Sequence, residues 1–210
     1  APPLLPAAPA CPGGGAGRAV SALRTFVALD VGPEARAGLA GWMAELGPRL
    51  PGFKWVEPEN LHLTLRFLGE TPAERLPALR EALAAAAAEV APFELVVRGA
   101  GAFPDAGAPR VLWAGVEATA ALAALQRRVE EAVRGLGWEP EGTPFRPHVT
   151  LARARHPRPR ADATAALAAA GTRVWGRMAV REVVLQRSTL TPAGPVYDPL
   201  GRFPLGRELR

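Results

Sequence analysis

The chain has 210 residues, of which 49% are hydrophobic and 21% are charged, and its formal net charge is +5. This composition is typical of a globular protein, and no apolar run approaches the ~18 residues of a membrane-spanning helix, so we expect no membrane association. The single cysteine, Cys11, excludes an intramolecular disulfide and a cysteine-based zinc site, which favours a cytoplasmic location.

The chain begins with a segment unlike the rest. Residues 1–17 carry no charge and are rich in proline and glycine. No basic region precedes an apolar one, so a secretory signal is not expected, and a composition of this kind favours disorder. We therefore expect a disordered tail over residues 1–19 and a single domain over residues 20–210.

The alternation of apolar and polar residues then predicts a mixed succession of strands and helices. Strands are expected at residues 23–30, 53–56, 60–69, 93–99, 110–116 and 146–153, and in one or two stretches after Gly171. Helices are expected at residues 33–46, 71–90, 119–136 and 162–170. Thr71 and Glu74 form a capping box at the second helix, and Gly137 is placed to end the third.

The order of these elements is roughly duplicated, since each half contains a strand that carries the same short motif. HLTL begins at His62 and HVTL begins at His148, 86 residues later. This separation is enough for each motif to belong to its own lobe of about 80–90 residues. We expect an α+β fold with two lobes, in which two antiparallel sheets face each other across a groove and the helices lie outside.

In a strand, residues two apart point to the same face of the sheet. His62 therefore shares a face with Thr64, and His148 shares a face with Thr150. Two imidazoles can take opposite protonation states, so that one removes a proton while the other supplies one. Two hydroxyls can donate hydrogen bonds to an anion held between them. Displacement at phosphorus needs these functions together.

A basic segment begins at the second motif and indicates the kind of partner. Residues 146–160 contain five arginines and no acidic residue. Such a run is often only a solvated surface, but it also suits a polyanion such as RNA, because phosphate contacts supply much of nucleic-acid affinity. A metal site would need three or four ligands, and the motifs offer two histidines without paired carboxylates.

The doubled H-x-T-x motif resembles the two-histidine phosphoesterase superfamily. NLHLTLRFLGE and RPHVTLAR are similar to the corresponding segments of the bacterial and archaeal RNA 2′,3′-cyclic phosphodiesterases, also called 2′-5′ RNA ligases. RTFVALD, RVLWAGV and LQRSTLTPAGPVYDPL resemble the opening, middle and closing segments of the same family. The resemblance implies the bilobal fold and hydrolysis of an RNA terminal 2′,3′-cyclic phosphate to a 2′-phosphomonoester, without a metal or other cofactor.

The resemblance also implies a role for individual residues. His62 takes the place of the proton donor to the leaving 3′ oxygen, and His148 that of the proton acceptor that activates water. Thr64 and Thr150 take the places of the phosphate-binding threonines, and Arg153 that of the active-site arginine. The spacing of Arg153 from His148 puts it on the opposite strand face unless the strand bends.

Two further residues are candidates for substrate binding. Arg146 shares the face of His148 by parity and is a second candidate for the phosphate. Phe26 either belongs to the core or lines the groove, where it would stack on a base.

Three functions remain open from the sequence. The first is the phosphodiesterase, acting as a monomer on RNA with cyclic phosphate ends. The second is the reverse reaction, which joins RNA ends through a 2′-5′ bond and would use the same residues. The third is a non-catalytic RNA- or nucleotide-binding module, which would not require both histidines.

Overall fold

The computed structural model describes residues 22–105, 108–156, 163–192 and 194–206. The tail expected at residues 1–19 lies outside these residues. The strands are β1 (Ala22–Asp30), β2 (Phe53–Trp55), β3 (His62–Pro72), β4 (Phe93–Phe103), β5 (Val111–Val116), β6 (His148–Ala154), β7 (Val174–Val180), β8 (Glu182–Leu190) and β9 (Pro195–Pro204). The helices are α1 (Pro33–Leu46), α2 (Leu76–Ala88), α3 (Ala120–Gly135) and α4 (Thr164–Ala169), with short 3-10 turns η1 (Gly47–Arg49), η2 (Pro58–Asn60) and η3 (Ala73–Arg75).

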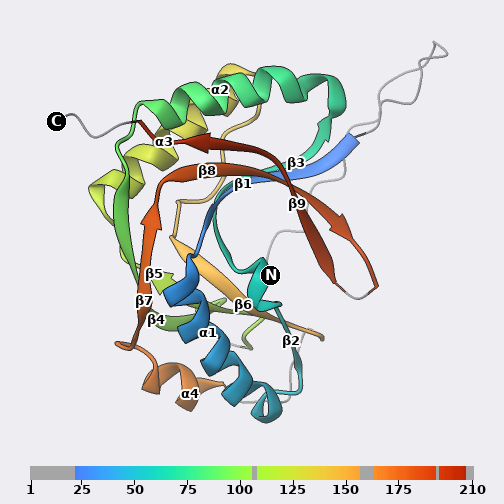
Figure 1. Ribbon diagram of the computed structural model, residues 1–210. Coiled ribbons are helices and arrows are strands. Elements are labelled where there is room, and N and C mark those ends of the chain that lie inside the picture. Colours follow the sequence, from blue (N-terminus) through green and yellow to red (C-terminus); the bar gives the residue numbers. More distant parts are fainter. Residues whose placement is uncertain (1–21, 106–107, 157–162, 193, 207–210) are drawn as a thin grey trace.

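The nine described strands form one antiparallel sheet that curls around a central space (Figure 1). Its hydrogen-bonded order is β7-β4-β5-β6-β3-β1-β8-β9, and β2 pairs with β6. Between β6 and β3, the register contains the single pair Leu63–Val149. The α+β class is confirmed, but the two sheets expected from the sequence are here two halves of one sheet, because this pair joins them. We call them the His62 half (β3, β1, β8, β9) and the His148 half (β7, β4, β5, β6).

Each half contains one motif strand, but elements that are adjacent in the chain often belong to different halves. Helix α1 follows β1 in the chain but packs on β7, in the other half. Helix α3 precedes β6 but packs on β3 and on α2. The C-terminal strands β8 and β9 extend the His62 half through the pairing of β8 with β1. The His62 half therefore combines strands from both ends of the described chain, whereas β4 to β7 of the His148 half are consecutive strands (Figure 1).

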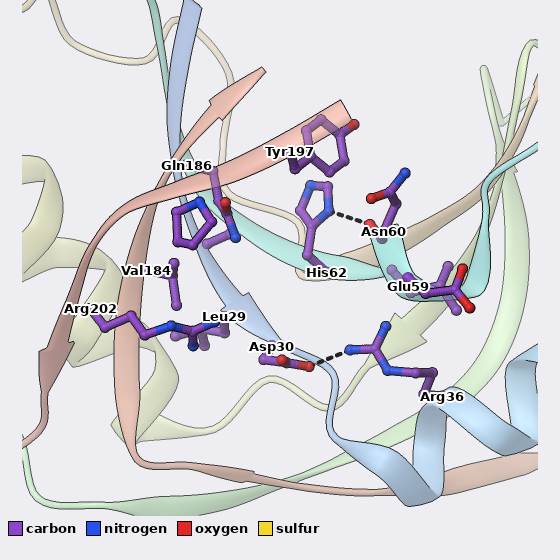
Figure 2. A pocket seen from close by; sticks show the side chains of 13 residues that line it. Leu29, Asp30, Arg36, Glu59, Asn60, His62, Val184, Gln186, Tyr197 and Arg202 are labelled. Atoms are coloured by element: carbon purple, nitrogen blue, oxygen red, sulfur yellow. Dashed lines mark hydrogen bonds and ion pairs between the residues drawn. The ribbon is translucent and has the colours of Figure 1, made fainter. Parts of the chain in front are cut away.

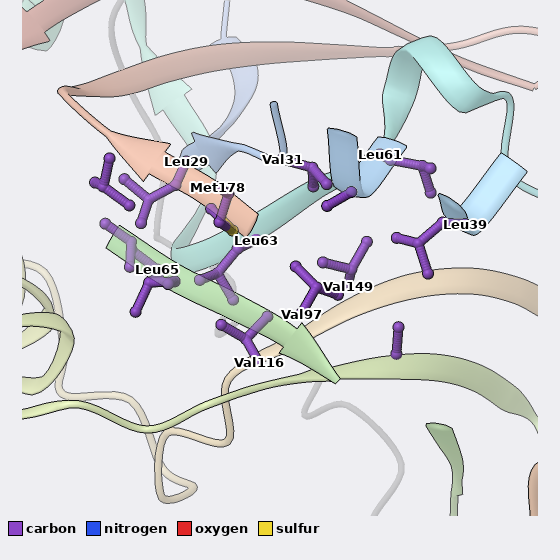
Figure 3. Packing of buried hydrophobic residues seen from close by; sticks show 14 of the residues in the cluster. Leu29, Val31, Leu39, Leu61, Leu63, Leu65, Val97, Val116, Val149 and Met178 are labelled. Atoms are coloured by element: carbon purple, nitrogen blue, oxygen red, sulfur yellow. The ribbon is translucent and has the colours of Figure 1, made fainter. Parts of the chain in front are cut away.

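The core lies between the sheet and its helices. In β3, the side chains that alternate with the motif, Leu63 and Leu65, are buried there together with Val149 of β6 (Figure 3). Helix α3 buries one stripe at helical spacing, and its N-terminal amides are capped by Thr119, whose Oγ1 accepts from the backbone N–H of Leu122 at 3.1 Å. The apolar residues of the two motifs thus hold the strands in place while His and Thr remain on the opposite face.

One helix boundary differs from the sequence-based expectation. Thr71 does not cap a helix, because β3 extends to Pro72 and Thr71 is fully buried in it. Its hydroxyl lies 2.7 Å from that of Thr25 on β1, so the hydroxyl is used in a cross-strand hydrogen bond. Helix α2 consequently begins only at Leu76, after the turn η3. Here a tertiary contact overrides a local capping pattern.

The strand β9 is not among the expected elements. It contains Pro195 and Pro199, which lower strand propensity and remove backbone donors. These prolines are tolerated because β9 lies at the end of the sheet order and pairs only with β8. The missed strand contributes Tyr197, whose ring lies 5.2 Å from that of His62.

A buried ion network holds the loop that leads into the second motif. Arg66 of β3 is 7% exposed. Its Nε lies 2.8 Å from Oε2 of Glu130 on α3, and its Nη1 donates to Oε2 of Glu141 at 2.6 Å. Nη2 donates to the backbone carbonyl of Glu139. Arg66 therefore connects the strand of the first motif to residues 139–141, which precede His148.

We expect Arg66→Met to destabilise the protein by about 2–4 kcal/mol, because the substitution removes the ion-pair partner of the largely buried Glu130 carboxylate. The matched control is Arg98→Met, which removes an exposed ion pair with Glu117 at 3.1 Å and should cost less than ~1 kcal/mol. Urea denaturation followed by circular dichroism measures both. Equal losses in the two variants would mean that the Arg66 network does not stabilise this loop.

Candidate functional site

The two motif histidines have the same local geometry. His62 Nδ1 lies 2.7 Å from the backbone oxygen of Asn60, and His148 Nδ1 lies 2.7 Å from that of Arg146. A carbonyl oxygen only accepts hydrogen bonds, so Nδ1 carries the proton in both rings. In each neutral imidazole, Nε2 is then the nitrogen that can accept a proton. The same hydrogen bond also fixes the orientation of each ring.

The register of the sheet brings the four motif side chains together. Leu63 pairs with Val149 in antiparallel register. The residues on either side of this pair therefore face each other in crossed order, so that His62 lies towards Thr150 and Thr64 towards His148. Within the described part of the chain, neither threonine hydroxyl has a protein hydrogen-bond partner. Both are free to bind an anion placed between the imidazoles.

Each motif is followed by an irregularity at its final leucine. The register of β3 against β1 skips Leu65, between the pairs Ala28–Thr64 and Val27–Arg66. The register of β6 against β5 skips Leu151, between Trp113–Thr150 and Leu112–Ala152. Such bulges shift the side-chain alternation by one residue. The burial pattern agrees, because two buried residues follow one another at 65–66 and again at 151–152.

The bulge at Leu151 explains the position of Arg153. Without it, Arg153 would point away from His148; with it, Arg153 returns to the face of His148 and Thr150. The equivalent residue after the first motif, five positions beyond His62, is Phe67. Phe67 is 52% exposed, and its ring lies 6.1 Å from that of Phe26. The groove face thus has an arginine beyond one motif and an aromatic ring beyond the other.

Aromatic side chains surround both imidazoles. The ring of His62 lies 4.8 Å from Phe26 and 5.2 Å, edge to face, from Tyr197. The ring of His148 lies 5.1 Å, edge to face, from Phe103 and 6.4 Å from Trp113. Phe26 is only 3% exposed, so its ring packs beside His62 and offers little surface to a ligand. Phe67 is the more exposed of the two rings.

Burial and neighbouring cations change the acidity of these groups. Burial is the largest cause that lowers the pKa of His62 below 6.5, and the charges of Arg153 and His148 lower it further. The pKa of His148 is lowered first by burial and then by Arg153 and Arg146. Burial raises the pKa of Tyr197, and Arg153 opposes that shift. The charge of Arg153 thus acts on His62, His148 and Tyr197 together.

Arg146 takes part in other contacts. Its guanidinium forms an ion pair with Asp105, with Nη1 3.0 Å from Oδ2, and lies 4.7 Å over the ring of Phe103. Its backbone oxygen receives the hydrogen bond from His148. To bind the phosphate, the guanidinium of Arg146 would have to break its ion pair with Asp105 or contact both anions at once. Arg153 has no ion pair with any described residue, so it is the better placed cation.

A pocket of about 180 Å³ adjoins His62 on the side of β1, β8 and β9. Figure 2 shows the His62 ring between Gln186 and Asn60, with Tyr197 above it and the ion pair of Asp30 and Arg36 below. The side-chain oxygen of Gln186 is buried and has no hydrogen-bond partner among the described residues. The pocket therefore offers an open acceptor beside the first imidazole.

Several of these residues were not identified from the sequence. Tyr197 lies on the unexpected strand β9, and Phe103 and Asn60 belong to no motif. Phe67 could have been found, because it stands at the same distance from His62 as Arg153 does from His148. The side chains of Arg158 and Arg160, in the basic segment, lie outside the described residues.

The described residues contain no group of three or more His, Cys, Asp or Glu side chains arranged to hold a metal ion. None of the described helices has the length and apolarity to cross a membrane.

Comparison with known proteins gives a consistent family assignment. The family model of the 2′-5′ RNA ligase superfamily matches residues 33–190. An RNA 2′,3′-cyclic phosphodiesterase of Archaeoglobus fulgidus is 37% identical over 86% of this chain and 99% of its own length. One of Geobacillus stearothermophilus is 37% identical over 86% of this chain, which spans 56% of that protein. The crystal structure of TT0787 of Thermus thermophilus superposes with a TM-score of 0.76 at 37% identity, covering 89% of this chain and 100% of that one.

The chain therefore belongs to the 2′-5′ RNA ligase superfamily. Within it, the identity to relatives matched over almost their whole length places the chain in the family of RNA 2′,3′-cyclic phosphodiesterases, and so among enzymes.

The electrostatic position of Arg153 can be tested without a substrate. We expect Arg153→Gln to raise the pKa of both His62 and His148, because its charge lowers both. The control Arg146→Gln should raise the pKa of His148 and leave that of His62 in place. Imidazole nitrogen shifts followed by NMR against pH measure both values. If Arg153→Gln moved only one histidine, Arg153 would not lie between the two.

Proposed function

We propose that the protein hydrolyses RNA terminal 2′,3′-cyclic phosphates to 2′-phosphomonoesters by acid–base catalysis between His62 and His148, without a metal ion. The observation that carries the proposal is the crossed arrangement of two His–Thr pairs around Leu63–Val149, with Arg153 acting electrostatically on both rings. The names of the relatives support the same substrate.

In the proposed reaction, neutral His148 takes a proton from water at Nε2 while the water oxygen attacks phosphorus. The bond between phosphorus and the 3′ oxygen breaks, and His62, protonated at Nε2, gives its proton to that oxygen. The hydrogen bonds from Nδ1 to backbone carbonyls leave Nε2 of each ring available for these transfers. Because the reaction exchanges the protonation states, a proton must pass from His148 to His62 through solvent before the next turnover.

The non-bridging phosphate oxygens accumulate charge as water attacks. Thr64 and Thr150 can donate to them, since their hydroxyls have no other partner in the described part of the chain. Arg153 is an exposed guanidinium on the same face, and it can bind two oxygens at once. The low pKa values of both histidines favour their neutral forms in the empty site, and an anionic substrate would favour protonation of the one that acts as acid.

We also propose a domain organisation, an oligomeric state and a location for the protein, as expected from the sequence. Residues 20–210 act as one bilobal domain, whose two halves face each other across the groove. The protein works as a monomer in the cytoplasm, on RNA ends that carry a cyclic phosphate.

The decisive experiment uses an oligonucleotide with a 2′,3′-cyclic phosphate, incubated with the protein in EDTA. We expect turnover and a 2′-phosphate product. Its isomer is identified by ³¹P NMR and by treatment with an enzyme that removes only a 3′-phosphate, which the product should resist. Loss of activity in EDTA that zinc or manganese restores would refute the metal-free mechanism. Formation of a 2′-5′ bond with a second RNA end would favour ligation, and binding without turnover would favour a non-catalytic module.

His62→Ala and His148→Ala should each reduce kcat by about 10²–10⁴-fold, the range for a positioned acid or base. The double variant should lose much less than the product of the two effects, because the residues act in one reaction step. His156, the third histidine, is exposed outside the strands and provides the control variant His156→Ala. Near-normal turnover of either single motif variant would contradict the assignment.

Arg153→Ala should reduce kcat/KM by about 10²–10³-fold on a cyclic mononucleotide, as expected for the loss of one donor to the developing anion. Arg146→Ala is the matched control and should have the smaller effect, since Arg146 is already paired with Asp105. Steady-state kinetics on the same mononucleotide compares them. The reverse order of the two effects would make Arg146 the phosphate clamp.

A further inference from the structure

A group of cations continues the groove beyond Arg153. Lys54 on β2 and Arg155 just after β6 are exposed and neighbour Arg153 along the sheet. Within the described ranges, none of the ion pairs involves any of these three residues. Side chains of like charge that are close together repel each other unless an anion lies among them. The cluster is therefore arranged to receive negative charge from outside the protein.

The position of Lys54 is set by strand register. Lys54 pairs directly with Arg153, between the pairs Phe53–Ala154 and Trp55–Ala152. Directly opposite residues share a face of the sheet, so Lys54 stands on the groove face with Arg153. Phe53, its neighbour, is buried on the other face. The pairing continues for one more step, because the N–H of Arg155 donates to the carbonyl of Gly52 at 2.9 Å.

The side chain of Lys54 also spans part of the groove. A Cβ placed on Gly194 would lie 3.5 Å from Nζ of Lys54, so the ammonium reaches the turn between β8 and β9. That turn belongs to the His62 half and is held close by Asn60, whose Nδ2 donates to the carbonyl of Pro195 at 3.1 Å. Lys54 thus lies where the two halves of the sheet approach each other, next to the site but beyond its arginine.

The two ends of the groove differ in chemistry. Beyond His62, along β3, lie the rings of Phe67 and Phe26. Beyond His148, along β6, lie Arg153, Lys54 and Arg155. On the His62 side, Arg36 and Arg202 line the adjoining pocket but are already paired with Asp30 and Glu182. A nucleotide chain with its cyclic phosphate between the histidines would meet the cluster of Arg153, Lys54 and Arg155 by placing its next phosphate at the second end.

We propose that Lys54, with Arg155, forms a second phosphate subsite that binds the phosphodiester preceding the terminal nucleotide of the RNA. The inference rests on the proposed function, because it takes the cyclic phosphate to lie between His62 and His148. Lysine is suited to such a contact, because its ammonium is a mobile point charge that does not require one fixed phosphate geometry. It is the only lysine in a chain with 24 arginines. The subsite makes the enzyme select polynucleotide ends over cyclic mononucleotides.

The test compares three substrates with the same terminal base. They are a cyclic mononucleotide, a dinucleotide with a terminal cyclic phosphate, and the same dinucleotide with a neutral methylphosphonate in place of its internal phosphate. For the unmodified protein, we expect kcat/KM to be highest for the charged dinucleotide. Lys54→Gln should lower the ratio of charged dinucleotide to mononucleotide by roughly tenfold, as for one lost charge-assisted contact. It should have no effect on the methylphosphonate, and it should reduce the salt slope for the charged dinucleotide by about one.

The control Arg80→Gln removes one exposed charge from the outer helix α2 and should leave the ratio unchanged. Lys54→Arg keeps the positive charge and should retain most of the preference for the charged dinucleotide over the mononucleotide. If Lys54→Gln lowered kcat/KM equally for all three substrates, Lys54 would act on the cyclic phosphate or only fix the turn at Gly194, and the subsite would be refuted. An unmodified protein that hydrolysed mononucleotide and charged dinucleotide equally well would also refute it. If the unmodified protein hydrolysed none of the three, the proposed function itself would fail.

Discussion

The pairing of Leu63 with Val149 is the contact on which the site depends. It is the one register pair between the two halves of the sheet in the described part of the chain, and both residues are completely buried. Each is preceded by the motif histidine and followed by the motif threonine. The pairing of these two apolar residues therefore determines where the histidines and threonines of the two motifs lie relative to each other. A shift of one residue by either strand in this register would turn the imidazole of that strand into the core.

The second constraint is the pair of bulges at Leu65 and Leu151. Each bulge shifts the side-chain alternation by one residue, so that the residue five positions after the histidine lies on the face of the histidine. This residue differs between the two halves. Arg153 places a charge beside both histidines and lowers the pKa of each, whereas Phe67 places an exposed ring next to Phe26. The two halves are related in backbone geometry, yet the residue five positions beyond the histidine is a cation in one half and an aromatic ring in the other.

Much of this architecture could be inferred from the sequence. The spacing of His62 and Thr64, repeated at His148 and Thr150, correctly placed each pair on one strand face, because strand periodicity is a short-range property. The position of Arg153 could not be derived in this way, because a bulge adds one residue to the count and leaves no clear trace in the composition. Thr71 was misread as a helix cap because its buried partner Thr25 lies 46 residues away. The prolines of β9 hid a strand that is possible only at a sheet edge, and with it Tyr197.

The exchange of elements between the halves has a consequence for how the protein can assemble. The strands β8 and β9 complete the half that begins with β1, so the His62 half cannot form from a continuous stretch of chain. The strands β4 to β7 of the His148 half are consecutive, but β7 is covered by α1 from the N-terminal part of the chain. A fragment that ended after α2 would contain the first motif but lack the strand that pairs with β1 on one side and the strand that pairs with β3 on the other. The sheet that carries both motifs can therefore be completed only after the C-terminal strands have been synthesised. Contacts of such long sequence separation are slow to form, so a nascent chain on the ribosome should remain inactive until nearly all of it has emerged.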